Sequence, residues 1–273
     1  MSVGRLCRKV RMSRQNYYRQ RKQRQARQAD EELMVALVKR ERRQQPRLGT
    51  RKLQRMLKEE LAEAGVKAGR DRMFKVLRER GMLLEPIRRA PRTTNGRHAL
   101  PVFRNLVKNL EATAPHQIWA GDLTYVRTEE GYLYLATILD RFSRKIVGYH
   151  VGEELRTEGC LEALSMAVGQ LPADRYPIHH TDRGCQYCCH EYVQRLWSRD
   201  LPVSMTEENH CYENAHAERI QGILKQEYGL GVTFRTQDQA RRAVEQGIWL
   251  YNHRRPHLSL NYRVPSVVHQ QAA

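Results

Sequence analysis

Apolar residues in the first third of the chain recur at intervals of three and four, which predicts three short helices. Leu33, Leu37 and Val38 form the apolar face of the first helix, which follows the acidic residues 30–32 and ends near Pro46. Two further stripes, each closed by a glycine suited to a helix C-terminus, cover residues 50–65 and 71–80. Three short helices joined by short turns favour a helix-turn-helix bundle that binds DNA. A plain charged bundle is the alternative.

After residue 111 the chain changes to short runs rich in β-branched and aromatic residues, which predict strands. Three runs separated by tight turns predict an antiparallel meander at residues 118–126, 132–139 and 145–150. Helices then alternate with strands: helices at 158–170, 191–199, 214–228 and 237–251, and strands at 176–180 and 201–205. This order predicts an α/β fold class, a mixed sheet flanked by helices.

Basic residues are concentrated at the front of the chain. The sequence holds 48 Lys and Arg against 30 Asp and Glu, and residues 1–92 alone hold 28 against 10. This excess predicts a polyanionic partner, and double-stranded DNA fits the predicted helical bundle. The candidate DNA contacts there lie at the starts of the second and third helices: Arg51, Lys52, Arg70 and Arg72.

These patterns predict four segments. A basic helical leader, with a helix start capped by Ser13, covers residues 1–29, and a helix-turn-helix-like DNA-binding domain covers residues 30–85. A proline-rich linker covers residues 86–111, and the α/β domain with two C-terminal helices covers residues 112–273. For the leader, a solvated segment without a partner is an equal alternative.

The apolar pattern also excludes two classes of protein. No run approaches the roughly 18 apolar residues that a membrane span needs, and the N-terminus lacks the apolar core of a signal peptide. We therefore expect a cytoplasmic, nucleoid-associated protein without a membrane partner. The six cysteines fit reduced thiols better than a disulfide framework, because no secretory signal accompanies them.

Two aspartates stand at predicted strands. Asp122 interrupts an apolar strand at a position that would face the core, and a buried carboxylate is costly unless it is paired or binds a metal. Asp182 directly follows the strand at residues 176–180, where side chains commonly point into a site. Each aspartate taken alone also fits a turn or a salt bridge.

A third carboxylate must come from the glutamates around the start of the next helix, Glu207, Glu208, Glu213 and Glu218. Glu218 is preferred because Lys225 follows two turns later on the same helix face, where both can face a nucleic acid. Three carboxylates can hold two divalent cations about 3.5 to 4 Å apart, which activate the attacking oxygen and stabilise the leaving oxygen of a phosphodiester. Such oxygen ligands favour Mg²⁺ or Mn²⁺.

The spacing of these residues resembles a known signature. Asp122, Asp182 and Glu218, with 35 residues between the last two and Lys225 seven residues later, are similar to the Asp-Asp-Glu motif of retroviral integrases and insertion-sequence transposases. Five flanking motifs resemble the insertion-sequence-three family of transposases, as does the helical segment at residues 45–84. These motifs are WAGDLTY (119–125), HTDRGCQY (180–187), NAHAE (214–218), LKQE (224–227) and YNHRRPH (251–257).

The resemblance implies a ribonuclease-H-like core in which Asp122, Asp182 and Glu218 are catalytic and hold two Mg²⁺ or Mn²⁺ ions. It implies a DNA transposase that nicks the ends of an insertion element and joins the freed 3′-OH to target DNA, with Lys225 on the element-end DNA. Joining two ends implies at least a homo-dimer on DNA. The chain would be the second-frame product, with a first-frame protein as its fusion or partner.

The chain departs from the family pattern beside the site. Residues 204–206 are Ser-Met-Thr where the family commonly has Ser-Met-Ser before a Gly, and residues 213–215 are Glu-Asn-Ala instead of Asp-Asn-Ala. Arg219 also stands where a Ser is common. None of these departures removes a ligand, so they concern DNA contacts more than catalysis.

Other interpretations of the motifs remain open. Cys185, Cys188 and Cys189 suggest a zinc site, although packed reduced cysteines are favoured because structural zinc sites usually pair two such motifs. Arg254 and Arg255 are expected to contact DNA or to support the last helix. The rival functions are a non-enzymatic DNA-binding regulator, which would gain nothing from three carboxylates facing a polyanion, and a hydrolytic nuclease of the same fold.

Overall fold

The computed structural model describes residues 2–85, 100–207 and 214–271. The chain divides into two compact units, Met1–Glu85 and Pro86–Ala273. Each unit has its own buried apolar cluster, so each is described by itself. No helix in the described part of the chain is long and apolar enough to cross a membrane.

The first unit is helical. Its helices are α1 (Val3–Lys9), α2 (Arg14–Gln44), α3 (Thr50–Met56), α4 (Lys58–Glu63) and α5 (Arg70–Glu79). The second half of α2 packs with α3, α4 and α5 around a core that includes Met34, Leu53, Leu61, Met73 and Leu77. The three predicted apolar stripes therefore form one cluster, although the second stripe is divided between α3 and α4 at Leu57.

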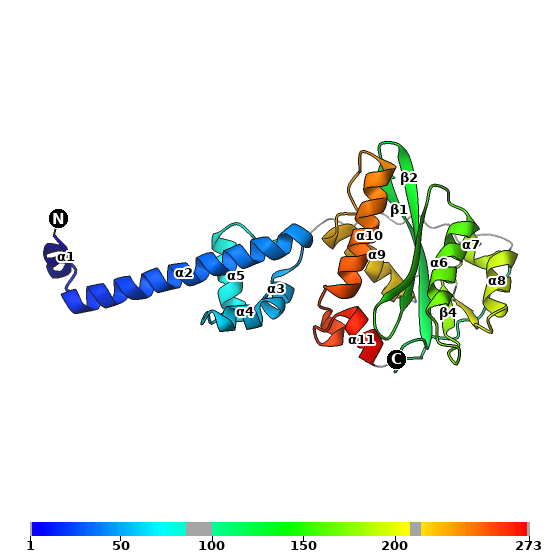
Figure 1. The fold of residues 1–273 in the computed structure, drawn as a ribbon, viewed down its shortest axis with the longest axis horizontal. Coiled ribbons are helices and arrows are strands. Elements are labelled where there is room, and N and C mark those ends of the chain that lie inside the picture. Colours follow the sequence, from blue (N-terminus) through cyan, green and yellow to red (C-terminus); the bar gives the residue numbers. More distant parts are fainter. Residues whose placement is uncertain (1, 86–99, 208–213, 272–273) are drawn as a thin grey trace. The chain divides into compact units, whose positions relative to one another are not determined.

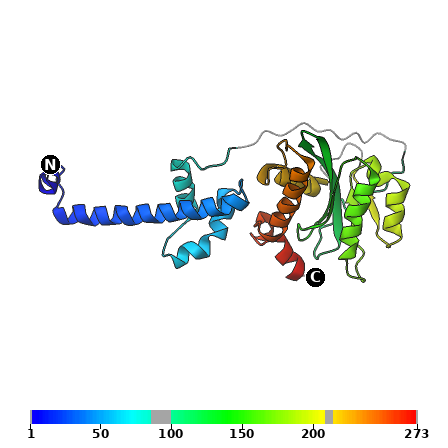
Figure 2. The same cartoon turned by 45° about the horizontal axis from the view of Figure 1, so that its top comes forward.

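Helix α2 is longer than the sequence pattern predicts. The pattern separates a leader at residues 1–29 from a helix that starts near residue 30. In the structure, α2 is one helix of 31 residues, Arg14–Gln44, that crosses this boundary. No glycine or proline lies between Ser13, its N-cap, and Gln45, its C-cap, so nothing breaks the helix. Figures 1 and 2 show the first half of α2, with α1 at its end, projecting beyond α3, α4 and α5.

The second unit is built on a five-stranded mixed sheet in the order β3-β2-β1-β4-β5. The strands are β1 (Ile118–Thr128), β2 (Gly131–Asp140), β3 (Ile146–Gly152), β4 (Ile178–Thr181) and β5 (Val203–Met205). Strands β1, β2 and β3 form the predicted antiparallel meander, and β4 and β5 add parallel pairs beside β1. The predicted α/β fold, a mixed sheet flanked by helices after a helical front, is confirmed.

Helices cover both faces of this sheet, as Figure 1 shows. On one face, α6 (Thr157–Gly169) and α8 (His190–Trp197) bury a cluster centred on Trp119, Leu164 and Leu196. On the other, α9 (Ala215–Glu227) and α10 (Gln237–His253) bury a cluster that includes Leu135 and Leu224. The elements that the sequence did not predict are short: α7 (Cys185–Cys188), the 3₁₀ helix η2 (Leu258–Leu260) and α11 (Pro265–Gln271).

Part of the predicted linker packs on the second unit. The backbone N–H of Leu106 donates to Ser204 Oγ at 2.9 Å, Val107 is buried, and the Phe103 ring meets the Trp197 ring edge-on at 6.0 Å between centroids. Residues 86–99 of that predicted segment lie outside the described residues. The α/β unit therefore includes residues that lie before the predicted domain start at 112.

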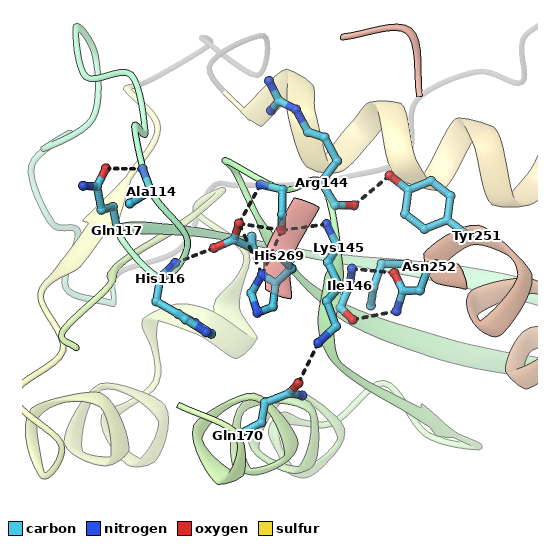
Figure 3. Close-up of polar contacts among 12 residues, drawn as sticks. Ala114, His116, Gln117, Arg144, Lys145, Ile146, Gln170, Tyr251, Asn252 and His269 are labelled. Atoms are coloured by element: carbon cyan, nitrogen blue, oxygen red, sulfur yellow. Dashed lines mark hydrogen bonds and ion pairs between the residues drawn. The ribbon is translucent and has the colours of Figure 1, made fainter. Parts of the chain in front are cut away.

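The turn between β2 and β3 fixes the C-terminal helices to the sheet (Figure 3). The Asn252 side chain both accepts from and donates to the backbone of Ile146, at 2.9 Å each way, and the Tyr251 hydroxyl donates to the carbonyl oxygen of Arg144 at 2.8 Å. Burial would raise the pKa of Asp140, but the nearby His269 ring and hydrogen bonds from Ser143 and from the His116 N–H hold this pKa below its ordinary value. This polar network orients α10 and α11 on the sheet.

Gly148 of β3 permits the close packing of α6. A Cβ added there would lie against the Ala163 carbonyl oxygen and 2.9 Å from the Ala167 Cβ. We expect Gly148→Ala to lower the free energy of unfolding by about 1–3 kcal/mol through overpacking, measured by thermal or urea unfolding. Gly169→Ala, at the end of α6 with open space around its Cβ, is the matched control and should cause no loss; equal stability of the two variants would contradict the packing argument.

Candidate active site

The two aspartates lie side by side because of strand register. The parallel pair β1 and β4 places Ala120 opposite His180, and Asp122 and Asp182 each lie two residues further along. Side chains two residues apart point to the same face, and neighbouring strands lie about 4.8 Å apart. Two carboxylates from separate parts of the chain thus meet at the carboxyl end of the parallel pair.

Two glycines allow this close approach. A Cβ on Gly121 would lie 2.9 Å from Thr181 Cγ2 and 3.2 Å from the His179 ring, so a larger residue would force β1 away from β4. The N–H of Gly184 donates to Asp182 Oδ1 at 3.0 Å and fixes that carboxylate. Glycine at these positions therefore serves close approach rather than an unusual backbone angle.

Helix α9 brings Glu218 to the same edge of the sheet, in its first turn. The Asn214 side chain, just before the helix, donates to the carbonyl oxygen of Gly121 at 2.9 Å. One turn beyond Glu218, the Gln221 side chain donates to Thr137 Oγ1 at 2.8 Å, and Thr137 pairs with Asp122 in the β1–β2 register. These bonds hold α9 against the strand that carries Asp122, while the Glu218 side chain itself is exposed.

Asn214 and Gln221 were not predicted as site residues, although their spacing from Glu218 and Lys225 along the helix indicates a shared face. Positions 214, 218, 221 and 225 follow spacings of four, three and four, so their side chains form one polar stripe on α9. Its apolar counterpart, with Ile220, Ile223 and Leu224, packs on the sheet. The position of Lys225 on the same helix face as Glu218 is as predicted.

The three carboxylates influence one another electrostatically. Burial raises the pKa of Asp122 to about 8, and the charges of Asp182 and Glu218 add to this rise, whereas the Leu123 N–H and the Lys225 charge oppose it. Burial also raises the pKa of Asp182. Asp122 is therefore the carboxylate on which both others act, and Lys225 only partly compensates the negative charge.

Lys225 is half-buried beside the carboxylates. Its Nζ lies 4.6 Å from the centroid of the Tyr125 ring, within cation–π range, and burial lowers its pKa although Tyr125 and Asp122 oppose that shift. Tyr125 lies on β1, three residues after Asp122. The ring thus holds the ammonium group near the site rather than out in solvent.

The donor chemistry of the site fits a hard divalent cation. Carboxylate oxygens are the ligands that Mg²⁺ and Mn²⁺ prefer. Burial first, and then repulsion from Asp182 and Glu218, raise the pKa of Asp122, and a cation would relieve that repulsion. Within the residues that the structure describes, no three His, Cys, Asp or Glu side chains gather closely enough to surround one ion.

The cysteine motif does not gather such a set within the described ranges either. Cys185 is exposed on α7, Cys188 is buried with its thiol 3.6 Å from Met205 Sδ, and Cys189 is half-buried with its thiol 3.2 Å from the Gln186 carbonyl oxygen. Cys211 lies outside the described residues.

Arg255 has a different role from the expected DNA contact. It is buried at 3 % exposure, and its guanidinium donates to both carboxylate oxygens of Glu227, each at 2.8 Å. A guanidinium held in this way is engaged inside the protein, which favours the supporting role over the DNA contact, the other role expected for Arg255. Arg254 is half-buried next to it.

In the helical unit, the predicted DNA contacts divide into two groups. Arg72 pairs with Asp30 at 2.9 Å and donates to the carbonyl oxygen of Lys67, so it ties α5 to α2. Arg51 and Arg70 are exposed, and Lys52 is half-buried. Arg51 and Arg70 line a shallow hollow together with Asp71, Phe74, Lys75 and Arg78. Lys75 and Arg78 were not predicted, because the candidate contacts were placed only at the start of this helix.

A ribonuclease-H-like fold with paired aspartates and a helical glutamate is that of an integrase core. The family model described as "Integrase core domain" matches residues 112–211, and a second model of the same description matches residues 199–265. Among solved structures, the chain resembles a chain in the cryo-EM structure of a simian T-cell lymphotropic virus intasome in complex with the PP2A regulatory subunit B56 gamma. That match has a TM-score of 0.51 at 18% identity and covers 81% of this chain and 74% of the other, which shows the fold alone.

Curated relatives show the family. The "Insertion element IS600 uncharacterized 31 kDa protein" of Shigella sonnei is 37% identical over 276 residues, which cover 98% of this chain and all of that protein. The transposase InsF of insertion sequence IS3A from Escherichia coli K12 is 37% identical over 169 residues, 62% of this chain and 59% of InsF. The chain belongs to the IS3 family of insertion-sequence transposases and carries their integrase-type catalytic core.

We expect substitution of Arg255, which pairs with Glu227, to lower the stability of the fold without changing how DNA affinity depends on salt. Arg255→Ala removes a buried guanidinium and its two hydrogen bonds to the Glu227 carboxylate, and it should lower the free energy of unfolding by about 3–5 kcal/mol. Below its melting temperature, the variant should keep the wild-type dependence of DNA affinity on salt, measured by fluorescence anisotropy. Arg254→Ala, at the half-buried neighbour, is the control for stability alone and should cost less free energy of unfolding. A salt slope smaller by about one in Arg255→Ala alone would restore this residue as a phosphate contact.

Proposed function

We propose that this chain cleaves the ends of an insertion element and joins them to target DNA, with Asp122, Asp182 and Glu218 as the catalytic residues. Membership of a transposase family supports DNA transposition. The observation that supports the assignment to this site is the register of β1 and β4, which sets two carboxylates side by side beneath the helix that carries the third.

The three carboxylates, Asp122, Asp182 and Glu218, would hold two Mg²⁺ or Mn²⁺ ions, whose charge would offset the repulsion that Asp182 and Glu218 exert on Asp122. When bound, such ions would supply a lowered pKa for the attacking water or hydroxyl and positive charge beside the leaving oxygen.

The chain's own residues bind and orient the two reacting strands. In the first step, a water oxygen forms a bond to the phosphorus at the element's end while the bond to the leaving 3′ oxygen breaks, which frees a 3′-OH. In the second, that 3′ oxygen attacks a target phosphodiester and displaces a target 3′ oxygen, so no bond to the protein forms. Lys225, held by Tyr125 next to Asp122, would pair with a phosphate of the element end.

DNA recognition would rest partly on the helical unit. Arg51, Arg70, Lys75 and Arg78 gather around one hollow there, and this cluster of cations beside the Phe74 ring favours contact with a phosphate backbone. Lys52 and Arg254 stay candidate contacts. We infer that at least two copies act together, since two ends must be joined, and that a first-frame protein assists as a fusion or partner.

The rival functions lose support for separate reasons. A regulator that only binds DNA has no use for a raised-pKa carboxylate cluster, which repels the polyanion that it would bind. A nuclease that only hydrolyses would share the site but not the second step. The joining assay below therefore separates these functions.

Substitution of Asp122 should stabilise the protein in the absence of metal. Because folding raises the pKa of Asp122 from 3.8 to about 8, the cost of its ionisation accrues as the pH rises through this range and is fully present above it. In EDTA at alkaline pH, Asp122→Asn should melt a few degrees above wild type. Mg²⁺ should raise the melting temperature of wild type and of Asp174→Asn but not that of Asp122→Asn. Asp174→Asn, at an exposed carboxylate, is the control; equal Mg²⁺ shifts in all three proteins would argue against the metal site.

The joining reaction tests the catalytic assignment. Purified wild type, mixed with a labelled duplex bearing the element's end, target DNA and Mg²⁺ or Mn²⁺, should give products joined to target. Glu218→Gln should lower joining by at least about a thousandfold while DNA affinity stays within twofold, because it removes a ligand and little bulk. Glu245→Gln, exposed on α10, is the matched control.

Three other outcomes have defined meanings. Cleavage without joining by wild type would favour the nuclease or a missing first-frame partner, and repetition with the fused protein separates these two. Full activity of Glu218→Gln would move the third ligand to another glutamate. Binding alone, with no cleavage even by the fused protein, would favour the regulator.

A further inference from the structure

The most one-sided charge on the molecule lies at its N-terminal end. Residues 2–29, called the basic arm below, contain ten Lys and Arg and no Asp or Glu. Among the residues that the structure describes, none of these ten cations forms an ion pair with a carboxylate. By contrast, Arg40 and Arg72 in the rest of the same unit pair with Glu60 and Asp30.

Most of the arm is helical although residues 19–29 pack against no other part of the described structure. Every residue from 19 to 29 is exposed, and no apolar stripe runs along this part of α2. Arg21, Arg24 and Arg27 are spaced three apart, so like charges neighbour one another on the helix. A helix that is polar all round and lacks opposite-charge pairs has little to stabilise it in water, and a polyanion would supply the missing charges.

The N-terminal end of the arm has packing and capping contacts of its own. Helix α1 packs against α2 through the buried Cys7, and Ser13 caps α2 by accepting from the Asn16 N–H at 3.1 Å. Tyr17 and Tyr18 meet edge-on at 5.4 Å between ring centroids, and Tyr18 is 54% exposed. The arm therefore begins with a small folded turn that presents aromatic and basic side chains together.

The distribution of cations around the helix distinguishes between two ways of binding DNA. At 100° per residue, the six cations of α2 in the arm point to all sides: Arg14, Arg19, Arg21, Lys22, Arg24 and Arg27. A helix that lay on one phosphate backbone would need cations on one side only. A helix about 10–12 Å wide that enters the major groove, about 12 Å wide, has phosphates on both flanks.

We propose that the basic arm is a second DNA-binding element, separate from the α3–α5 bundle and the catalytic site, whose helix lies in the major groove and contacts the phosphates of both strands. The partner is double-stranded DNA, so the proposal rests on the proposed function and adds to it a contact surface. The 16 residues 14–29 would span roughly 24 Å of groove.

The test uses the full chain and a mixed-sequence duplex. The variant Arg21→Gln/Lys22→Gln/Arg24→Gln/Arg27→Gln removes four exposed cations and keeps residues that favour helix. By anisotropy across a range of KCl concentrations, it should bind at least about tenfold more weakly, and the slope of log affinity against log salt should fall by about 3 to 4. An unchanged slope would overturn the proposal.

Two further variants make this result specific. Arg195→Gln/Arg199→Gln/Arg235→Gln/Arg242→Gln removes the same charge from exposed positions of the second unit and should change the slope by less than one. Gln25→Pro keeps every cation but breaks α2 inside the arm, and it should weaken binding about tenfold. If Gln25→Pro binds like wild type, the arm acts as an unstructured polycation and groove insertion is wrong.

The outcome can be separated from failure of the proposed function. The arm variant should retain the Mg²⁺-induced rise in melting temperature, which reports an intact catalytic unit, and should lose guanine N7 protection from methylation, which reports the major groove. Glu218→Gln should show the opposite pattern, with binding kept and joining lost. Absence of DNA binding by wild type would overturn the arm and the transposase together.

Discussion

The close parallel pairing of β1 and β4 is the constraint on which the catalytic unit depends. Gly121 lets the two strands approach, and the register then sets Asp122 and Asp182 at equivalent positions. Parallel pairing needs a long connection, and the chain uses it for β2, β3 and α6, which form one side of the core. The pairing of β1 and β4 therefore both holds the sheet together and positions the two aspartates.

That contact brings negatively charged side chains together, at a cost in electrostatic free energy. Asp122 is desolvated and faces two further carboxylates, which together raise its pKa to about 8. The surroundings limit the cost by a half-buried Lys225 and by hydrogen bonds from backbone N–H groups to each aspartate. Under the proposed function, a bound cation would relieve this repulsion, and a carboxylate group with so little compensation differs in this respect from a structural salt bridge.

The sequence predicted most of the fold because the elements carry clear local signals. The strands of the meander and the apolar stripes of α6, α9 and α10 were found close to their bounds, and short elements such as α7 and α11 were missed because one or two turns leave little periodicity. Of the site, the local motifs indicated Asp122, Asp182 and the polar face of α9. The sequence could not reveal that Asn214 bonds the Gly121 carbonyl oxygen, because that contact joins residues 93 apart.

The arginines show what could not be predicted from the sequence, namely which cations are paired within the protein. In a chain with net charge +18, every arginine is a plausible phosphate contact, yet Arg255 and Arg72 are held by carboxylates from distant segments. Composition cannot separate these structural cations from those of the basic arm, because the distinguishing feature is a partner brought near by folding. Where the chain supplies carboxylates, arginine stabilises its own fold. The arm supplies none, so its charge is available for a partner outside the protein.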